Sequence, residues 1–221
     1  MTIVSYALLT RRADVPVQDF RRHWQEVHAP LVSELPGLTA YVQHLPVAVE
    51  PPPPYDGVAE LWFEDLDALR AAARSAAWAE MRADESRFID RQRTAGIAVA
   101  PSPVPVPDPR PVGGVGLLGV MHRRPDLTRP AYLEHWRGRH GTLAARLPGL
   151  RAYVHGVPVD LGSDPPFDGV SHLWFDTIDE LRAAFHTGVG REVRADEGEF
   201  VDATRSFALL LHEHAFVPRP S

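Results

Sequence analysis

Residues 23–42, HWQEVHAPLVSELPGLTAYV, recur as residues 135–154, HWRGRHGTLAARLPGLRAYV. The two copies lie 112 positions apart (135 − 23), and the same offset holds without a gap from His23 to Asp90. Roughly half of the aligned residues are identical, which unrelated segments do not reach by chance. The chain therefore carries one domain twice, and such a pair is the arrangement expected of a fused dimer.

The length of the chain agrees with two domains. Its 221 residues accommodate two domains of about 110 residues each. We expect a first repeat over residues 1–100 and a second over residues 112–221. Residues 101–111 carry proline at nearly every second position, and such a segment is typically extended and semi-rigid. We therefore expect these residues to be a linker.

Hydrophobic patterns predict the same order of elements in both repeats, namely strand, helix, strand, strand, helix, strand. The first helix has apolar residues at helical spacing, with Phe20, Trp24, Val27 and Leu31 forming one stripe. In the first repeat we expect strands over 3–10, 39–46, 57–63 and 97–99, and helices over 17–34 and from Asp65 or Asp67 to Arg93. The second repeat has the equivalent first and last strands at 115–122 and 207–211.

This order is the ferredoxin-like βαββαβ pattern, which belongs to the α+β class. A four-stranded sheet with both helices on one face leaves its other face uncovered, and that face has to be buried. The second repeat is available for this purpose in the same chain. We therefore expect the two repeats to pack sheet to sheet as an intramolecular, pseudo-dimeric α/β barrel.

Four motifs occur in a fixed order in both repeats: His-Trp-x-x-x-His, Leu-Pro-Gly-Leu-x-x-Tyr-Val, (Tyr/Phe)-Asp-Gly-Val and Asp-Glu-x-x-Phe-(Ile/Val)-Asp. Together they resemble the EthD domain of the dimeric α/β barrel superfamily. This resemblance implies an enzyme without a cofactor, as in lactone isomerases of aromatic degradation and in cyclases, dehydratases or decarboxylases of polyketide pathways. It also implies more distant kinship with quinone-forming monooxygenases that use no cofactor and with haem-binding dye-decolourising peroxidases.

Histidines of the first helix are the leading catalytic candidates. Imidazole titrates closest to neutral pH, so a histidine serves well as general acid or base. In an α-helix, residues five apart are rotated by about 140°, so we expect His23 and His28 to lie on two sides of Trp24. That spacing does not favour a helical metal site, which uses residues four apart. We favour His28 and His140 over His23 and His135, and a packing or hydrogen-bonding role is the competing interpretation for all four.

Other candidates come from strands and from differences between the repeats. Tyr41 and Tyr153 follow the Pro-Gly turn and either bind a substrate carbonyl or pack in the core. Asp56 and Asp168 precede a glycine, where turn formation competes with a functional role. The second repeat has His122, His172, His212 and His214 where the first has Thr10, Glu60, Ala100 and Ser102, so we expect the two sites to have diverged. The proposed substrate-binding residues are Trp24, Trp136, Asp56, Asp168, His44, His172, His122, Trp62 and Trp174.

Composition limits the chemistry and the partners. The net charge is −6. This argues against nucleic acids and anionic membranes as partners, because both attract basic surfaces. The sequence has no cysteine and no lysine, which excludes disulfides, thiolate sites and Schiff bases on lysine. We see no nucleotide-binding motif, no signal peptide and no membrane-spanning run. We expect a cytoplasmic protein that is a monomer with an internal pseudo-dimer, and a further homodimer is the alternative. We expect it to contain no metal and no cofactor.

The sequence therefore predicts an isomerase or lyase that acts on a small oxygenated ring compound, such as a polyketide intermediate, by histidine-mediated proton transfer. Two alternatives remain open. One is a cofactor-free monooxygenase with a hydroquinone-type substrate. The other is a non-catalytic protein that binds or sequesters a small molecule. Fold analogy supports all three.

Overall fold

The computed structural model describes residues 1–110 and 114–219, and the chain divides into two compact units. Unit 1 contains Met1–Ala100 and the residues from Glu213 onward, and unit 2 contains Pro101–His212. The units thus differ from the sequence repeats at two places. Residues expected to form the linker belong to unit 2, and the end of the last strand belongs to unit 1. Pro111, the last expected linker residue, lies outside the described residues.

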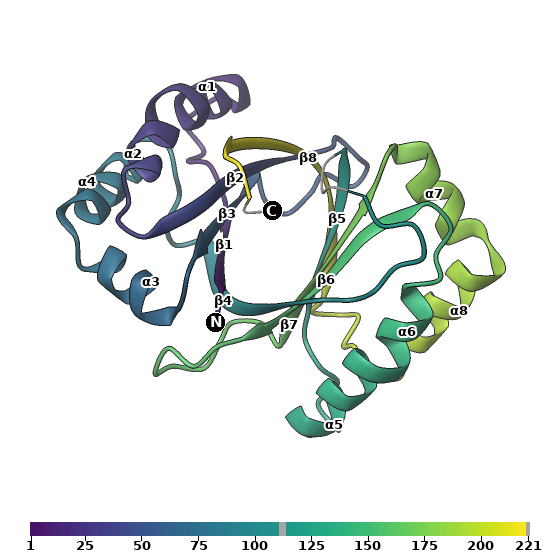
Figure 1. Cartoon of the computed structure of the whole chain (residues 1–221). Helices are drawn as coiled ribbons and strands as arrows, with labels where there is room; N and C mark the ends of the chain where they lie inside the picture. Colours follow the sequence, from purple (N-terminus) through teal and green to yellow (C-terminus); the bar gives the residue numbers. More distant parts are fainter. Residues whose placement is uncertain (111–113, 220–221) are drawn as a thin grey trace. The chain divides into compact units, whose positions relative to one another are not determined.

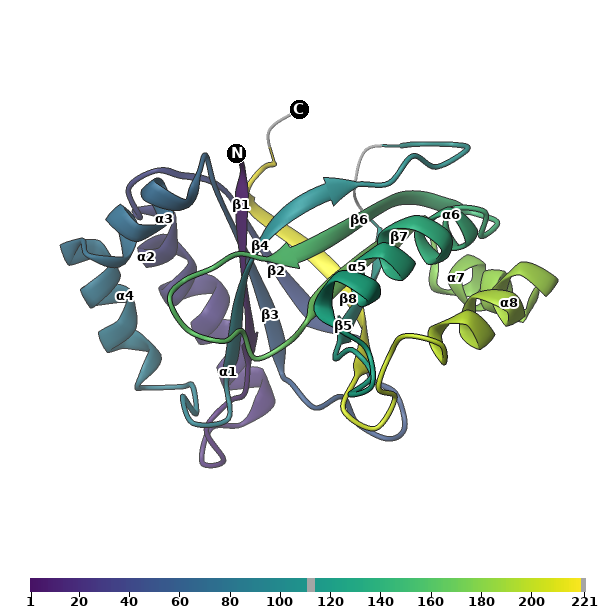
Figure 2. The same ribbon diagram turned by 90° about the horizontal axis from the view of Figure 1, so that it is seen from below.

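Unit 1 contains a four-stranded antiparallel sheet in the order β4-β1-β3-β2. Figure 1 shows its helices together on one face of that sheet. Figure 2 shows the same helices on the same face of the sheet, seen from below. The elements are β1 (Ile3–Leu9), α1 (Val17–His23), η1 (Trp24–His28), α2 (Ala29–Ser33), β2 (Leu38–Pro46), β3 (Gly57–Phe63), α3 (Leu66–Ala73), α4 (Ala76–Glu85) and β4 (Ala95–Pro103).

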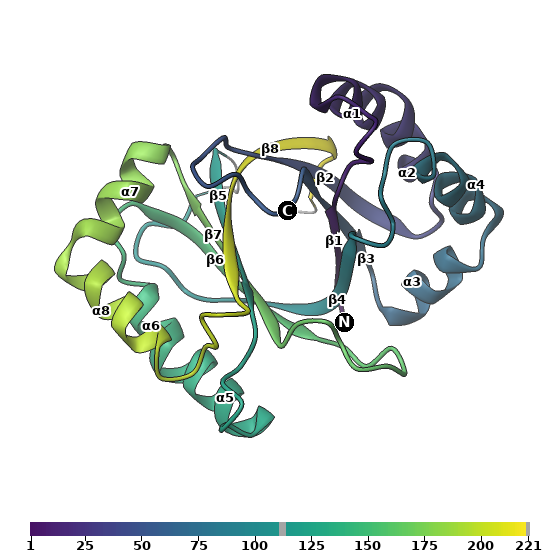
Figure 3. The same ribbon diagram turned by 180° about the vertical axis from the view of Figure 1, so that it is seen from behind.

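Unit 2 repeats this architecture, with an antiparallel sheet in the order β8-β5-β7-β6. Figure 3 shows its helices on one face of the sheet from behind. The elements are β5 (Val115–Met121), α5 (Arg129–His135), η2 (Trp136–His140), α6 (Gly141–Ala144), β6 (Leu150–Pro158), β7 (Gly169–Phe175), α7 (Ile178–His186), α8 (Gly188–Glu197) and β8 (Phe207–Val217).

The predicted α+β class and the order of strands and helices agree with this structure, and the packing of the two sheets against each other stays a prediction. Asp65 is the N-cap of α3, because its side chain accepts a hydrogen bond from the Ala68 amide at 2.8 Å. The last strands are longer than expected. β4 continues through Pro103 because alternating prolines keep the chain extended, and the Val104 amide then donates to the Tyr153 carbonyl at 2.8 Å.

The first helix of each unit departs from the predicted α-helix. Five residues of each, η1 and η2, form a π-helical turn with hydrogen bonds between residues five apart, as from the Ala29 amide to the Trp24 carbonyl. The extra residue shifts the buried stripe. Val27, expected in the core, is 44% exposed, and His28 takes the buried position. The predicted stripe is therefore wrong beyond Trp24.

The two helix tryptophans are fully buried and pack on the first residue of a strand. A Cβ built on Gly57 would lie 2.5 Å from the Trp24 ring, and one on Gly169 would lie 2.6 Å from the Trp136 ring. A side chain at either position would overpack the core, which typically costs about 1–3 kcal/mol. The glycine that follows the aspartate in both repeats is thus a packing requirement of the helix. Within residues 1–110 and 114–219, none of the helices combines the length and the apolar character that a membrane crossing requires.

Candidate functional site

Two histidines of the first helix share one carboxylate. In unit 1, His23 Nε2 lies 3.0 Å from Asp84 Oδ1, and His28 Nδ1 lies 3.0 Å from Asp84 Oδ2. The expectation that His23 and His28 lie on two sides of the helix is wrong. It assumed α-helical rotation, whereas the π-helical turn brings residues five apart back to the same face.

Unit 2 contains the same arrangement. His135 Nε2 lies 3.1 Å and His140 Nδ1 lies 3.0 Å from Asp196 Oδ2. Arg139 Nε adds an ion pair at 2.9 Å from Asp196 Oδ1. These separations are hydrogen-bond lengths. Both clusters are therefore hydrogen-bonded triads.

The Asp-Glu-x-x-Phe motif supplies the aspartate of each triad. Asp84 and Asp196 lie near the ends of α4 and α8 and are buried. The motif phenylalanine packs on the histidine rings, with the Phe88 ring centroid 4.6 Å from His23 and 5.1 Å from His28. In unit 2, Phe200 occupies the equivalent place. The motif thus fixes the imidazole orientation through one charge and one ring.

A cavity lies beside the triad in each unit, with His28 or His140 in its wall. The unit 1 cavity measures about 300 Å³ and the unit 2 cavity about 360 Å³. Equivalent residues line both, among them the histidine, a tyrosine, an arginine and a glutamate: His28, Tyr41, Arg82 and Glu85 in unit 1, and His140, Tyr153, Arg194 and Glu197 in unit 2. These volumes lie at the lower end of those known for small-molecule pockets.

Burial keeps the cavity histidines neutral. Desolvation lowers the pKa of His28 and of His140 below the usual value, although the neighbouring aspartate opposes this shift. Burial alone would raise the pKa of Asp196, but hydrogen bonds from the two histidines hold it below its usual value. Because a carboxylate only accepts hydrogen bonds, each cavity histidine carries its proton on Nδ1. Nε2, on the other side of the ring, keeps its lone pair.

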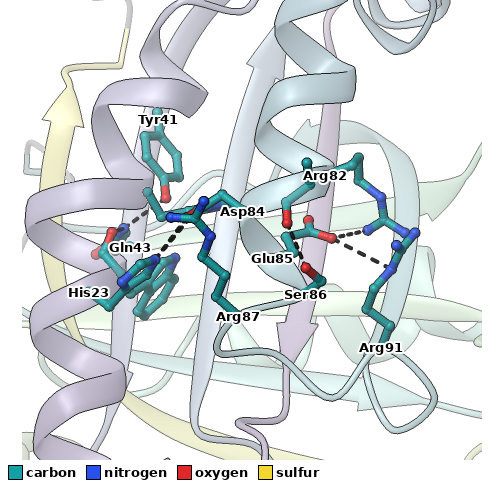
Figure 4. A network of polar contacts seen from close by, with 12 residues as sticks. His23, Tyr41, Gln43, Arg82, Asp84, Glu85, Ser86, Arg87 and Arg91 are labelled. Atoms are coloured by element: carbon teal, nitrogen blue, oxygen red, sulfur yellow. Dashed lines mark hydrogen bonds and ion pairs between the residues drawn. The ribbon is translucent and has the colours of Figure 1, made fainter.

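Sequence reasoning missed a glutamate in each cavity wall, which is buried in unit 1 (Glu85) and exposed in unit 2 (Glu197). Glu85 and Glu197 directly follow the triad aspartates and line the cavities. Desolvation raises the pKa of both carboxyl groups. Figure 4 shows Asp84 turned toward His23 and Glu85 turned toward Arg82 and Arg91. The identical Arg-Ala-Asp-Glu sequence in both repeats was the available signal, but it shows neither residue's neighbours.

The predicted catalytic tyrosines are buried in the cavity walls with different partners. Gln43 Nε2 donates to the Tyr41 hydroxyl at 2.8 Å (Figure 4). The same Nε2 also donates to the Trp24 carbonyl. In unit 2, the Tyr153 hydroxyl lies 2.7 Å from His155 Nε2. Burial raises the pKa of both phenols, so both stay protonated. Because Gln43 donates to the Tyr41 oxygen, the Tyr41 proton is directed to another acceptor.

Several predicted substrate-binding residues lie at other places. Trp24 lines the unit 1 cavity, whereas Trp136 donates from Nε1 to Ser171 Oγ at 3.2 Å. Asp56 accepts a hydrogen bond from the Arg11 amide at 2.9 Å and pairs with its guanidinium. Asp168 holds Arg123 in the same way. These two aspartates thus fix the loop after the first strand.

The other predicted residues on the strands form separate contacts and are not among the described residues that line the two cavities. His44 Nε2 and Trp62 Nε1 bond to the Glu60 carboxylate at 2.6 and 2.7 Å. The rings of His172 and Trp174 stack at 3.7 Å, and His122 meets Phe167 edge-on. Strand alternation explains why these residues do not line the cavities. Tyr41 and Gln43 face the helices, and the residues next to them on the strand point to the opposite face of the sheet.

The fold and the duplicated triads define a protein with two ferredoxin-like domains in one chain. The EthD domain model matches residues 12–92 and 124–204. The chain therefore belongs to the EthD domain family, and both of its repeats are EthD domains. No curated protein matches the sequence.

Solved structures support the fold over the whole chain. An anthrone oxidase-like protein is similar with a TM-score of 0.71 and 11% identity, covering 100% of this chain and 96% of its own. A candidate monooxygenase from Lactobacillus acidophilus has a TM-score of 0.60 at 12% identity, with 97% and 95% covered. A candidate chlorite dismutase reaches 0.58 at 12% identity, again with 97% and 95% covered. At these identities the similarity concerns the fold.

Proposed function

We propose that this protein is an enzyme of the isomerase or lyase type that needs no cofactor and moves protons on a small oxygenated ring compound. One observation carries the proposal. A buried, neutral histidine in each cavity wall is held by an aspartate through Nδ1, which leaves Nε2 as a base. The same division of roles between a base and an orienting carboxylate operates in hydrolase triads.

The chemistry follows from the groups around the cavity. Nε2 removes a proton from the carbon next to a carbonyl group, and the aspartate stabilises the imidazolium that results. Negative charge then collects on the carbonyl oxygen and requires a hydrogen-bond donor. In unit 1 the Tyr41 hydroxyl is suited to donate there, because Gln43 already donates to its oxygen.

The cavity walls point to a compact substrate with few polar groups. Unit 1 contributes Leu61, Trp78 and Met81, and unit 2 contributes Leu173, Phe185 and Val193. Volumes of about 300 and 360 Å³ accommodate one or two rings. An aromatic polyketide intermediate or a lactone meets these requirements.

A monooxygenase that uses no cofactor is the second candidate, because an anthrone oxidase-like protein and a candidate monooxygenase have the same fold. Its first step on a hydroquinone-type substrate is also proton removal by a base. The resulting anion then reacts with dioxygen and is not reprotonated. A third candidate, a small-molecule binding protein, uses the cavity without chemistry.

Hydrogen exchange in D₂O distinguishes the three candidates. The purified protein is incubated with a panel of cyclic ketones, lactones and hydroquinones and followed by NMR, with dissolved oxygen recorded in parallel. The proposal predicts exchange of a proton next to the carbonyl, or isomerised product, without oxygen consumption. Oxygen consumption that depends on substrate selects the monooxygenase. Stoichiometric binding without exchange or product contradicts both enzymatic candidates.

The pH dependence of kcat/KM follows from the lowered histidine pKa. The base is active when the imidazole is neutral, so activity should rise with pH to a plateau. Its inflection should lie below the ordinary histidine pKa of about 6.5, because burial lowers the pKa of His28 and His140. An inflection above pH 7 in the free enzyme would show that another group acts as the base.

A further inference from the structure

The cavity tyrosines of the two units bond to different side chains. Gln43 Nε2 donates to the Tyr41 hydroxyl at 2.8 Å. In unit 2, the Tyr153 hydroxyl lies 2.7 Å from His155 Nε2, and position 155 is the equivalent of position 43. The amide nitrogen of Gln43 only donates hydrogen bonds, whereas a neutral imidazole donates with one nitrogen and accepts with the other. His155 is therefore able to take up a proton at one nitrogen while it gives one away at the other.

A second difference between the repeats makes room for the His155 ring. Unit 1 has Ala29 where unit 2 has Gly141. A Cβ built on Gly141 would lie 2.8 Å from His155 Cε1, which is closer than two such carbon atoms approach. The ring also contacts Trp136 and Tyr153, with a distance of 4.6 Å between ring centres in both pairs. Because glycine accompanies the histidine in unit 2, the position of this imidazole is built into the fold.

His155 also lines a groove that is separate from the unit 2 cavity. The groove measures about 470 Å³, and exposed residues such as Glu134 and Arg137 line it, so it lies at the protein surface. Tyr153 lines the cavity that contains His140. None of the described residues lines both the groove and the cavity. The hydrogen bond between Tyr153 and His155 therefore connects the wall of the cavity with the wall of the groove.

Burial keeps both members of this pair uncharged. His155 is 2% exposed. Desolvation, reinforced by repulsion from His140 and Arg137, lowers the pKa of His155 to about 3. Desolvation also raises the pKa of Tyr153, so its hydroxyl stays protonated. Since neither group ionises near neutral pH, a proton enters the pair at one end only as another leaves at the other end.

We propose that His155 relays protons between the surface groove and Tyr153 in unit 2, an inference that rests on the function proposed above. His140 takes the proton of the C–H bond that breaks. Tyr153 gives its hydroxyl proton to the enolate oxygen, the Nε2 proton of His155 passes to the tyrosine oxygen, and a proton from water or a buffer acid enters at Nδ1. When His140 protonates another carbon, these transfers run in reverse. The relay thus returns to its starting state, and the composition of the substrate is unchanged.

Exchange of the tyrosine hydroxyl protons with solvent tests the relay without a substrate. NMR of protein ¹³C-labelled at tyrosine Cζ, in mixed H₂O and D₂O, measures the rate for each hydroxyl. The Tyr153 proton should exchange about 100-fold faster than the Tyr41 proton, the lower end of the effect of a positioned acid or base. His155→Gln, which installs the residue of unit 1, should reduce the Tyr153 rate to that of Tyr41. Equal rates in the unmodified protein, or an unchanged Tyr153 rate in the variant, would overturn the inference.

A control separates the relay from local opening of the structure. The Val104 amide donates to the Tyr153 carbonyl at 2.8 Å, so its own hydrogen exchange reports whether the chain opens there. This amide should exchange equally in the unmodified protein and in His155→Gln. If the amide rate falls together with the hydroxyl rate, opening explains the exchange and the relay is contradicted.

Turnover is tested in the His28→Ala background, which leaves the triad of unit 2 as the intact one. There His155→Gln should lower kcat by about 100-fold and leave KM unchanged, because His155 acts through Tyr153 and does not touch the substrate. Added imidazole should restore activity to His155→Ala, and a loss that imidazole does not restore would contradict the relay. If His155→Gln keeps full kcat and His140→Ala abolishes turnover in this background, the inference fails and the proposed function stands. Turnover that survives both His28→Ala and His140→Ala together would overturn the proposed function itself.

Discussion

Replacing His28 and His140 together by alanine is expected to lower kcat by about 10²- to 10⁴-fold, the range for losing a positioned general base. Both imidazoles bond through Nδ1 to a buried aspartate and line a cavity. Among the described residues, the histidine that alanine replaces is the one member of each triad that lines the cavity. Steady-state kinetics on the compound found by hydrogen exchange measure the loss.

Single variants and a control define the origin of this loss. His28→Ala and His140→Ala, measured singly, should show how much of the loss each unit contributes. His186 lies exposed on α7 and bonds to the Arg182 carbonyl, so His186→Ala should leave kcat unchanged. Full activity in the double variant, with its fold verified by circular dichroism, would show that the triads take no part in catalysis.

Arg219→Met is expected to destabilise the protein by about 3–5 kcal/mol, the usual cost of leaving one member of a buried ion pair without its partner. The Arg219 guanidinium donates to both Glu60 carboxylate oxygens, at 3.2 and 2.9 Å, and to Glu213 at 2.8 Å. Glu60 is fully buried in β3, so its charge cannot be solvated by water when the guanidinium is removed. Urea denaturation measures the free energy of unfolding.

A double variant separates the lost charge pair from lost packing. Glu60→Gln removes the buried charge and keeps acceptor and donor groups for Trp62 and His44. Combined with Arg219→Met, it should recover part of the stability, since contacting residues are not additive. A loss below about 1 kcal/mol in Arg219→Met alone would place this pair among ordinary surface ion pairs.

The sequence was sufficient for the elements and their order because these depend on local patterns. Period-two alternation defined β3 at Gly57–Phe63, and a local hydrogen bond made Asp65 an N-cap. The duplicated motifs led to the EthD family, which the domain matches confirm. His28 and His140 were selected for their position near the end of a helix, and the structure places both in cavity walls.

The remainder of the site depends on geometry that a sequence pattern does not contain. The π-helical turn changes the rotation per residue, so Val27 was expected in the core and His28 beside it, whereas the reverse holds. Asp84 reaches the helix histidines only through the tertiary fold, since it lies 61 positions from His23. Arg194 donates to the Phe185 carbonyl, a contact that the sequence pattern does not show.

The most direct test of the account is the protonation state of the two cavity histidines, measured by ¹⁵N NMR on labelled protein at pH 7. The account predicts that His28 and His140 are neutral and carry their proton on Nδ1, with Nε2 unprotonated. Asp84→Asn and Asp196→Asn should each shift the tautomer of the histidine in the same unit. Imidazolium at pH 7, or a neutral ring protonated on Nε2, would contradict the assignment of these residues as bases.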